Sequence, residues 1–219
     1  MKAGFLPADW PAPTNILAGT VLRDSNYELP VAPSYLEQVH GTRVVRLGSR
    51  DFEREPPQAD AVIGCRDGDM CLVKTADCLP VLLCGSDGSE IAAIHAGWRG
   101  LAAGIIETTV SAMATAPGDL LAWFGPAISQ PAFEVGDEVR EAFMRQRPEA
   151  SAAFMPNDRG RWQADLSGLA EQRLRGAGVR AIFGGGLCTF SDPVRFYSYR
   201  RDGETGRLLS FVHLAGLRT

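Results

Sequence analysis

The sequence of 219 residues predicts an α+β fold, in which mixed β-sheets are flanked by helices. Short apolar runs rich in β-branched residues recur along the chain, and glycine, proline and aspartate mark the turns between them. Only three amphipathic helical patterns interrupt these runs, too few for a regular alternation of strands and helices. A chain of this length buries enough apolar surface to fold without disulfides or a structural metal. We expect one catalytic domain over residues 1–219, or two fused α+β halves.

The strands are predicted from apolar runs that end at turn-forming residues. In chain order these runs cover residues 16–20, 34–41, 42–47, 59–64, 70–75, 79–84, 90–95, 120–125, 179–185, 194–199 and 208–214. Two glycine-containing segments between consecutive runs, residues 84–90 and 201–207, have the composition of hairpin loops. The predicted sheets therefore contain antiparallel neighbours.

Apolar residues at helical spacing predict helices over about residues 99–115, 137–146 and 166–176. In the first of these, Ile106, Val110 and Met113 share one face, and a proline and a glycine follow the expected end. Asp137 and Asp165 stand at the start of the other two helices. An aspartate in this position caps the first helical turn.

The composition favours a small-molecule partner. The chain has 22 lysines and arginines against 26 aspartates and glutamates, a sequence pI near 5.4 and no basic tract. This charge balance argues against nucleic acid and against an anionic membrane surface. No apolar run reaches the roughly 18 residues of a membrane span, and the N-terminal segment lacks the apolar core of a signal peptide. Five cysteines without a C-x-x-C pair fit a reducing compartment, so we expect a cytoplasmic monomer or small homo-oligomer.

The segment HAGWRG joins an apolar strand to a helical pattern. Gly97 lets the backbone turn, and Arg99 stands at the start of the helix. Free N–H groups at a helix start favour an anion, and the planar guanidinium of arginine suits phosphate. The segment therefore predicts an anion pocket. The alternative is structural: Gly97 and Gly100 allow a tight turn, and Trp98 fills the core.

Three residues with metal-ligating side chains stand at the ends of predicted strands. His40 and His95 are two of only three histidines and are flanked by glycines, and Cys78 lies between them in the sequence. One thiolate and two imidazoles suit a divalent ion and leave the fourth tetrahedral position open for catalysis. Their separation along the chain is not a local ligand motif. The alternative, in which each is a packed core residue, therefore stays open.

These residues stand within motifs that resemble those of a known family. The motifs are QVHG, KTADCLPV, HAGWRG, FGPAI with FEVG, and FYSYRRDGETGR, at residues 38–41, 74–81, 95–100, 124–136 and 196–207. In this order they resemble the YfiH family, also called the laccase-domain, FAMIN-like or polyphenol oxidase family. The resemblance runs across nearly the whole chain, and no ligand position departs from it.

The resemblance implies a duplicated α+β fold of mixed-sheet α/β subdomains with flanking helices, related to cysteine hydrolases. It also implies a metal, zinc or copper, that is bound by His40, Cys78 and His95. The implied activity is phosphorolysis of adenosine, inosine and methylthioadenosine, with adenosine deamination as a side activity. Two further activities compete with it: copper-dependent polyphenol oxidation, and hydrolytic editing of peptidoglycan precursors.

Phosphorolysis needs a bound phosphate, a proton donor for the leaving purine and stabilisation of charge at the sugar. We expect Arg99 to bind the phosphate, Asp77 to act as the acid and Lys74 to support them electrostatically. The structural alternatives are a turn residue for Asp77 and a solvated charge for Lys74. Cys78 completes the expected catalytic set. The residues expected to contact substrate are Arg99, Gly97, Trp98, Tyr197 and Arg200, with Cys188 and Arg201 near them.

The sequence also separates the competing activities. A multicopper laccase needs many more histidines than the three in this chain. The H-x-E and P-C-x-x-C signature of cytidine-type deaminases is absent. A metal-free couple of Cys78 with His95, oriented by Asp77, would instead catalyse acyl or amide hydrolysis, so metal content separates the phosphorylase from the hydrolase. The other residues of these types that we expect in the core are Cys71, Cys84 and His213.

Overall fold

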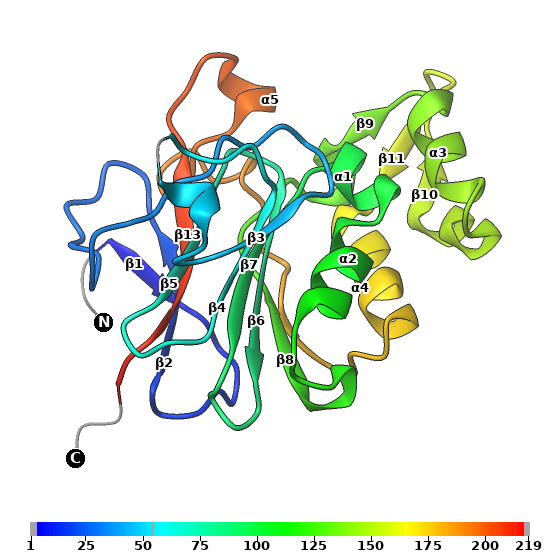
Figure 1. The fold of residues 1–219 in the computed structure, drawn as a ribbon. Coiled ribbons are helices and arrows are strands. Elements are labelled where there is room, and N and C mark those ends of the chain that lie inside the picture. The colour runs from blue at the N-terminus through cyan, green and yellow to red at the C-terminus, as the bar shows by residue number, and fades with distance from the viewer. Residues whose placement is uncertain (1–3, 54, 217–219) are drawn as a thin grey trace.

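The computed structural model describes residues 4–53 and 55–216 and has three layers (Figure 1). A four-stranded sheet packs on one face of a six-stranded sheet, and helices cover the other face. A small three-stranded sheet lies beyond these helices. The arrangement confirms the predicted α+β class. The duplication, the number of domains and the relation to cysteine hydrolases stay predictions.

The central sheet contains six strands. In spatial order they are β12 (Ala181–Gly184), β8 (Leu120–Phe124), β6 (Leu79–Gly85), β7 (Ile91–Ala96), β4 (Ala61–Gly64) and β3 (Val44–Arg46). The two edge strands, β12 and β3, run parallel to their neighbours, and the other pairs are antiparallel. The predicted hairpin at residues 84–90 is confirmed, because this segment joins β6 to its antiparallel neighbour β7.

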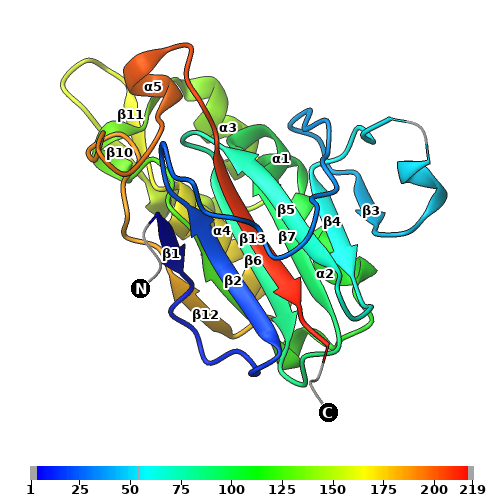
Figure 2. The same cartoon turned by 90° about the vertical axis from the view of Figure 1, so that its left-hand side faces the viewer.

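The second sheet is antiparallel throughout and faces the viewer in Figure 2. Its strands, in order, are β1 (Phe5–Pro7), β2 (Ile16–Val21), β13 (Leu208–Leu214) and β5 (Met70–Thr75). The third sheet is formed by β10 (Phe154–Pro156), β11 (Trp162–Ala164) and β9 (Glu134–Val135). The sequence analysis missed β1 and the third sheet, because strands of two or three residues leave no periodic pattern.

The helices are short. They are α1 (Trp98–Ala103), α2 (Ile105–Ala112), α3 (Asp137–Met144), α4 (Leu166–Gly176) and α5 (Tyr199–Asp202), with 3₁₀ helices at Arg50–Phe52, Pro117–Asp119, Gln130–Ala132 and Pro148–Ala153. The prediction of one helix over residues 99–115 is wrong, because Gly104 adopts φ +101° and separates α1 from α2. None of the described helices is long and apolar enough to cross a bilayer.

The two predicted helix caps have different outcomes. Asp165 caps α4 as expected, since its side chain accepts a hydrogen bond from the Gly168 N–H. Asp137 is not the cap of α3: Gly136 occupies that position, and the Asp137 carboxylate accepts a hydrogen bond from the Trp162 indole at 2.7 Å.

The central strands are buried on both faces, which explains their uninterrupted apolar runs. In β6, Val81 and Leu83 pack in the core beneath the helices, whereas Leu82 and Cys84 pack between the two sheets. The apolar positions of β7 alternate in the same way. The predicted core positions of Cys71 and Cys84 are confirmed, as is that of His213, whose Nδ1 lies 3.1 Å from the Asp69 carbonyl oxygen.

Two predicted strands and one predicted hairpin are wrong. Residues 34–41 form a loop whose only ladder contact is an isolated bridge between Glu37 and Gln58. Residues 194–199 form turns that lead into α5, and this helix replaces the hairpin expected at residues 201–207. Both segments contain the apolar and aromatic residues typical of strands, but only isolated backbone hydrogen bonds link them to neighbouring segments, so no ladder forms. All other predicted strands are confirmed.

Candidate metal centre and cavity

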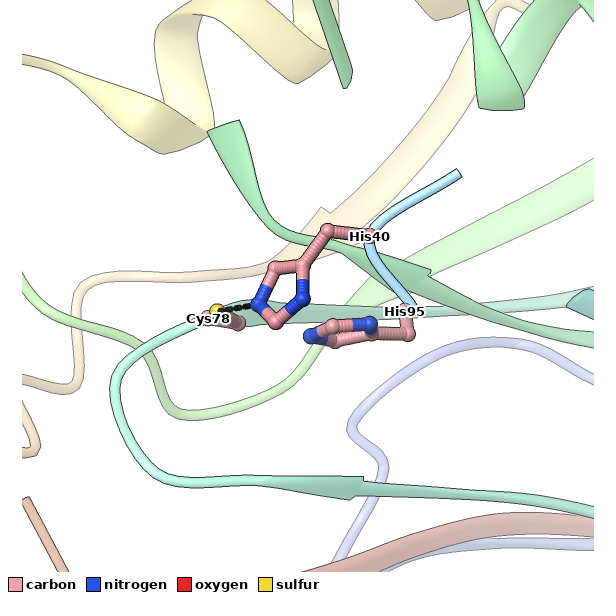
Figure 3. Close-up of side chains that lie close together, drawn as sticks. All are labelled: His40, Cys78 and His95. Carbon is pink, nitrogen blue, oxygen red and sulfur yellow. Dashed lines mark hydrogen bonds between the residues drawn. The ribbon is translucent and has the colours of Figure 1, made fainter. Parts of the chain in front are cut away.

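The structure brings His40, Cys78 and His95 together (Figure 3). One potential ligand atom from each lies within 4.8 Å of the others, and His40 Nε2 lies 3.9 Å from Cys78 Sγ. The two imidazole rings meet edge to face, with centroids 4.7 Å apart. His95 is the penultimate residue of β7, Cys78 lies where the chain crosses from the second sheet to the central one, and His40 comes from the loop before β3. Tertiary structure therefore joins residues that are far apart in the sequence.

The glycines of HAGWRG are required by close approach at this cluster. A Cβ atom on Gly97 would lie 2.8 Å from His40 Cδ2 and 3.1 Å from Cys78 Sγ. A Cβ atom on Gly100 would lie 2.7 Å from the Gly41 carbonyl oxygen, in the loop that carries His40. Any side chain at either position would push His40 away. The two glycines therefore make room for the loop that carries His40, and the anion pocket expected from the segment stays a prediction.

Asp60 supports the cluster and was missed by the sequence analysis. Its side chain is fully buried, and Oδ1 lies 2.8 Å from His95 Nδ1. The same carboxylate accepts backbone hydrogen bonds from His40 at 2.9 Å and from Gly41 at 2.6 Å. One acid therefore orients the imidazole of His95 and fixes the loop that carries His40. The available signal was an aspartate at the start of a fully buried strand, which is costly without a partner.

The donor set fits a divalent metal of intermediate softness. Because His95 Nδ1 faces the Asp60 carboxylate, Nε2 is the ring nitrogen of His95 that is left to bind a metal. The distance of 3.9 Å between His40 Nε2 and Cys78 Sγ is close to the edge of about 3.6 Å in a tetrahedral zinc site. Three protein ligands leave one coordination position for water or substrate.

The charges in the cluster favour a thiolate. Burial raises the pKa of the Cys78 thiol, but hydrogen bonds with His40 and His95 outweigh burial and lower the pKa to about 6. Burial lowers the pKa of His95, but its hydrogen bonds with Asp60 and Cys78 raise it to about 9. The pKa of Asp60 is lowered in turn, since its hydrogen bonds outweigh the effect of burial. Cys78 therefore presents the deprotonated form that metals and electrophiles require.

The cluster opens into a cavity of about 650 Å³. Its walls carry four basic side chains: Lys74, Arg99, Arg200 and Arg207. Among the described residues, none of these four side chains forms an ion pair with a carboxylate. Cations gathered in a concave site without partner carboxylates attract an anionic ligand. The cavity is also lined by Leu36, Glu37, Gln38, Thr75, Ala76, Ile128, Phe133, Leu166 and Tyr199.

Aromatic rings and carbonyl groups hold the basic side chains. The Arg99 guanidinium lies over the Trp98 ring at 4.6 Å, and Lys74 Nζ lies 5.1 Å from the centre of the Tyr35 ring. Arg200 donates a hydrogen bond to the Glu134 carbonyl at 3.1 Å. Because α1 has only six residues, its N-terminus adds little to these side chains as an anion site, and the anion pocket expected from the sequence stays a prediction.

Asp77 lines the cavity but is engaged by its surroundings. It adopts φ +88°, and its carboxylate accepts hydrogen bonds from the Thr189 hydroxyl at 2.6 Å and the Arg200 N–H at 2.7 Å. These contacts match the turn residue weighed as the alternative. Asp77 therefore ties the crossing between the sheets to the segment that carries Arg200.

The carboxyl-terminal motif contributes differently from the prediction. Tyr197 is outside the cavity lining, because its hydroxyl donates to the Asp24 carboxylate at 2.9 Å. Tyr199 lines the cavity instead. Arg201 donates to the carbonyl of Thr189 at 2.7 Å and does not line the cavity. Cys188 is also outside, and accepts hydrogen bonds from the Ser129 N–H and the Ser191 hydroxyl.

The fold and the site together define a class of mixed α/β proteins in which a His₂Cys cluster lines a cavity with basic walls. A family model described as "Multi-copper polyphenol oxidoreductase laccase" matches residues 19–215. The chain belongs to this family, and the predicted resemblance to the YfiH or laccase-domain proteins is confirmed.

Named relatives and a solved structure agree with this assignment. The chain is 52% identical over 186 residues to the Escherichia coli protein named purine nucleoside phosphorylase YfiH, covering 85% of this chain and 75% of that protein. It is 42% identical to purine nucleoside phosphorylase PA4543 of Pseudomonas aeruginosa, covering 96% and 98% of the two chains. The crystal structure of Neisseria meningitidis protein NMB0706 superposes with a TM-score of 0.88 at 39% identity, covering 97% of this chain and all of that one.

Proposed function

We propose that this protein cleaves purine nucleosides with phosphate, releasing the free base and ribose 1-phosphate. The observation that carries the proposal is the set of four basic side chains, without partner carboxylates among the described residues, beside the His₂Cys cluster. The names of the relatives support the same reaction. We include adenosine, inosine and methylthioadenosine as substrates.

In the proposed reaction, some residues of the cavity bind phosphate and others position them. Arg99 and Lys74 hold phosphate, because a planar fork and a point charge together neutralise its oxygens. Trp98 keeps the guanidinium of Arg99 in place. Asp77 positions Arg200 through its backbone, a more restricted role than the acid expected from the sequence. Positioning and charge stabilisation are the main contributions a protein makes to such a displacement.

His40, Cys78 and His95 would hold the metal. We favour zinc over copper, since two imidazoles and a thiolate suit zinc and a phosphorolytic site needs no redox change. A zinc ion in such a site acts as a Lewis acid and lowers the pKa of bound water, which also provides for adenosine deamination as a side activity. Asp60 keeps the ligand nitrogen of His95 directed at the site.

The experiment that tests the proposal is a nucleoside panel. Purified protein is incubated with adenosine, inosine and methylthioadenosine, with and without phosphate, and the products are separated by chromatography. We expect base release that requires phosphate and yields ribose 1-phosphate, or its methylthio derivative. Base release that is equal without phosphate would contradict phosphorolysis, and conversion of adenosine to inosine would report the deaminase activity.

One observation favours a second candidate, a metal-free hydrolase of amide or ester bonds. Asp60, His95 and Cys78 form a chain in which an acid orients an imidazole beside a thiol whose pKa is lowered to about 6. This arrangement activates a cysteine nucleophile, with Asp60 in the orienting role that the sequence analysis gave to Asp77. It would suit the editing of peptidoglycan precursors. Stoichiometric metal in protein purified without added metal would exclude it.

Polyphenol oxidation receives less support. The three histidines of the chain cannot supply a multicopper cluster, and His213 is held by a backbone carbonyl. Oxidation of a phenol by copper-loaded protein but not by zinc-loaded protein would identify it as a property of the added metal. Cytoplasmic location and a monomeric or small oligomeric state remain our predictions.

A further inference from the structure

Thr75 is the last residue of β5 and lines the cavity. Only 1% of its surface is exposed, and its hydroxyl oxygen has no hydrogen-bond partner among the described residues. Within β5, Thr75 shares a face with Cys71 and Val73, which pack between the two sheets. Its side chain therefore stands where the core between the sheets meets the cavity.

The other buried threonines behave differently. Thr20 Oγ1 lies 2.8 Å from the Ser210 hydroxyl, Thr109 donates to a helical carbonyl at 2.7 Å, and Thr189 donates to Asp77 at 2.6 Å. A buried hydroxyl without a partner destabilises a fold, so most such groups are satisfied. Thr75 is the exception among these threonines and lines the cavity, which points to a hydrogen-bond partner on a bound ligand.

The end of β5 is held in place without using the Thr75 side chain. The Gln38 amide donates to the Lys74 carbonyl at 2.8 Å and accepts from the Lys74 N–H at 2.7 Å. These two bonds clamp the loop that carries His40 to the strand, as a neighbouring strand would. The end of β5, and with it the backbone of Thr75, therefore has a fixed position in the wall of the cavity.

We propose that Thr75 is a specificity-determining residue that binds the 2′-hydroxyl of the substrate ribose. The inference rests on the proposed function, because phosphate held by the cations must face the anomeric carbon of the sugar. The 2′-hydroxyl is on the adjacent carbon, on the same face as the incoming phosphate. It is thus the neutral polar group that comes closest to the cations, and a threonine hydroxyl can both donate to it and accept from it.

The test is a cycle of two protein forms and two substrates. Wild type and Thr75→Val are assayed for phosphate-dependent base release from inosine and from 2′-deoxyinosine. Valine keeps the shape and removes the hydroxyl. We expect kcat/KM for inosine to fall about tenfold in Thr75→Val, with a change below about twofold for 2′-deoxyinosine, because only inosine loses a hydrogen bond. Thr75→Ser should retain the preference for inosine.

Equal losses on both sugars, or no loss on either, would overturn the assignment of Thr75 to the 2′-hydroxyl. Suppose instead that Thr75→Val lowers kcat/KM for inosine and 2′-deoxyinosine but not for 3′-deoxyinosine. That result would also overturn the assignment, because it would identify the 3′-hydroxyl as the partner of Thr75.

A matched control separates binding from folding. Thr20→Val makes the same substitution at a buried strand position outside the cavity lining. It leaves the Ser210 hydroxyl without its partner, so Tm should fall and the sugar preference should stay unchanged. Thr75→Val removes an unpartnered hydroxyl, so its Tm should rise or stay equal. A fall in Tm as large as that of Thr20→Val would show that the Thr75 hydroxyl supports the fold, against our inference.

Failure of the proposed function would give a different result. If wild type releases no base from any nucleoside in the presence of phosphate, the reaction assignment fails, and binding of inosine and 2′-deoxyinosine is then measured by calorimetry. Tighter binding of inosine that Thr75→Val abolishes would uphold the role of Thr75 in recognising ribose. Equal affinities, or no binding of either, would overturn it.

Discussion

The metal centre and the wall of the cavity are built from polar side chains held in contrasting ways. In the centre, side chains restrain one another: Asp60 bonds His95 and the backbone of His40, and His40 contacts Cys78. On the wall, aromatic faces hold Lys74 and Arg99, and backbone carbonyls hold the two other cations. We therefore expect a change in the centre to affect all three ligands, and a change on the wall to affect one side chain alone.

The largest effect is expected at the centre. Cys78→Ser exchanges a soft anionic ligand for a hydroxyl that is hard to deprotonate, so phosphorolysis should fall on the order of 100-fold or more. His40→Ala and His95→Ala should do the same, and double variants should lose little beyond either single one, because one missing ligand already disrupts the site. Steady-state assays of single and double variants measure this.

Cys65→Ser provides the matched control, since Cys65 is exposed and outside the cavity. It should retain wild-type activity. Additive losses among the three ligand variants would mean that the residues act independently, and the contrast between centre and wall would not hold.

A smaller effect is expected at Asp60, which contacts the proposed metal ligands but is not one of them. Asp60→Asn keeps the size of the side chain but removes the charge that orients His95 and the loop of His40. Metal affinity should fall about 10- to 100-fold, as for other carboxylates that support a ligating imidazole. Competition with a chromophoric chelator measures it. An unchanged affinity would show that Asp60 serves the fold alone.

A substitution of Arg99 on the cavity wall should affect the use of phosphate and not the use of the nucleoside. Arg99→Ala removes the fork that we assign to phosphate, so KM for phosphate should rise about tenfold while KM for the nucleoside changes less than about twofold. Arg99→Lys should recover part of the loss, since the charge returns without the fork. Equal changes in both KM values would assign Arg99 a structural role through its stacking on Trp98.

The smallest effect on activity concerns Cys188, a cysteine outside the cavity. Burial raises the pKa of its thiol, but hydrogen bonds from Ser129 and Ser191 outweigh burial and lower it to about 7. Because the thiolate is the nucleophile, its alkylation rate should rise with pH and reach half its maximum near pH 7. Burial raises the pKa of Cys71 and Cys84, so both should stay unreactive at that pH.

Peptide mapping after iodoacetamide treatment across a pH series measures these rates. Ser191→Ala removes one of the bonds to Cys188 Sγ and should move the midpoint for Cys188 to higher pH. A midpoint for Cys188 that does not move would contradict the role of Ser191. Alkylation of Cys188 should leave phosphorolysis nearly unchanged, since its side chain is outside the cavity lining.

Scarce histidines beside glycines drew attention to His40 and His95, but the local sequence left a core role open, and the family resemblance supplied the set of three ligands. The strands were predictable where burial on both faces leaves long apolar runs, as in β6 and β7. Asp60 was missed, because an acid at the start of a buried strand indicates a partner but does not identify it, and only the fold places Asp60 against His95. Residues 34–41 were predicted as a strand, but Gln38 pairs with β5 through its side chain and not through its backbone.

The cavity wall was less predictable for a geometric reason. A strand over residues 194–199 would direct Tyr197 and Tyr199 to the same side, whereas the turn before α5 separates them. Only Tyr199 reaches the cavity. Arg207 also lines the cavity, although it was not among the residues expected to contact substrate. Loop conformation decides which cations converge, and the local pattern of residues does not specify loop conformation.

The metal content of the protein tests the central claim most directly. Wild type and Cys78→Ser are purified without added metal and analysed by inductively coupled plasma mass spectrometry alongside phosphorolysis of inosine. We predict about one zinc ion per chain in wild type, and the loss of both zinc and activity in Cys78→Ser. Metal-free wild type that is fully active, or an active Cys78→Ser protein without metal, would contradict the account.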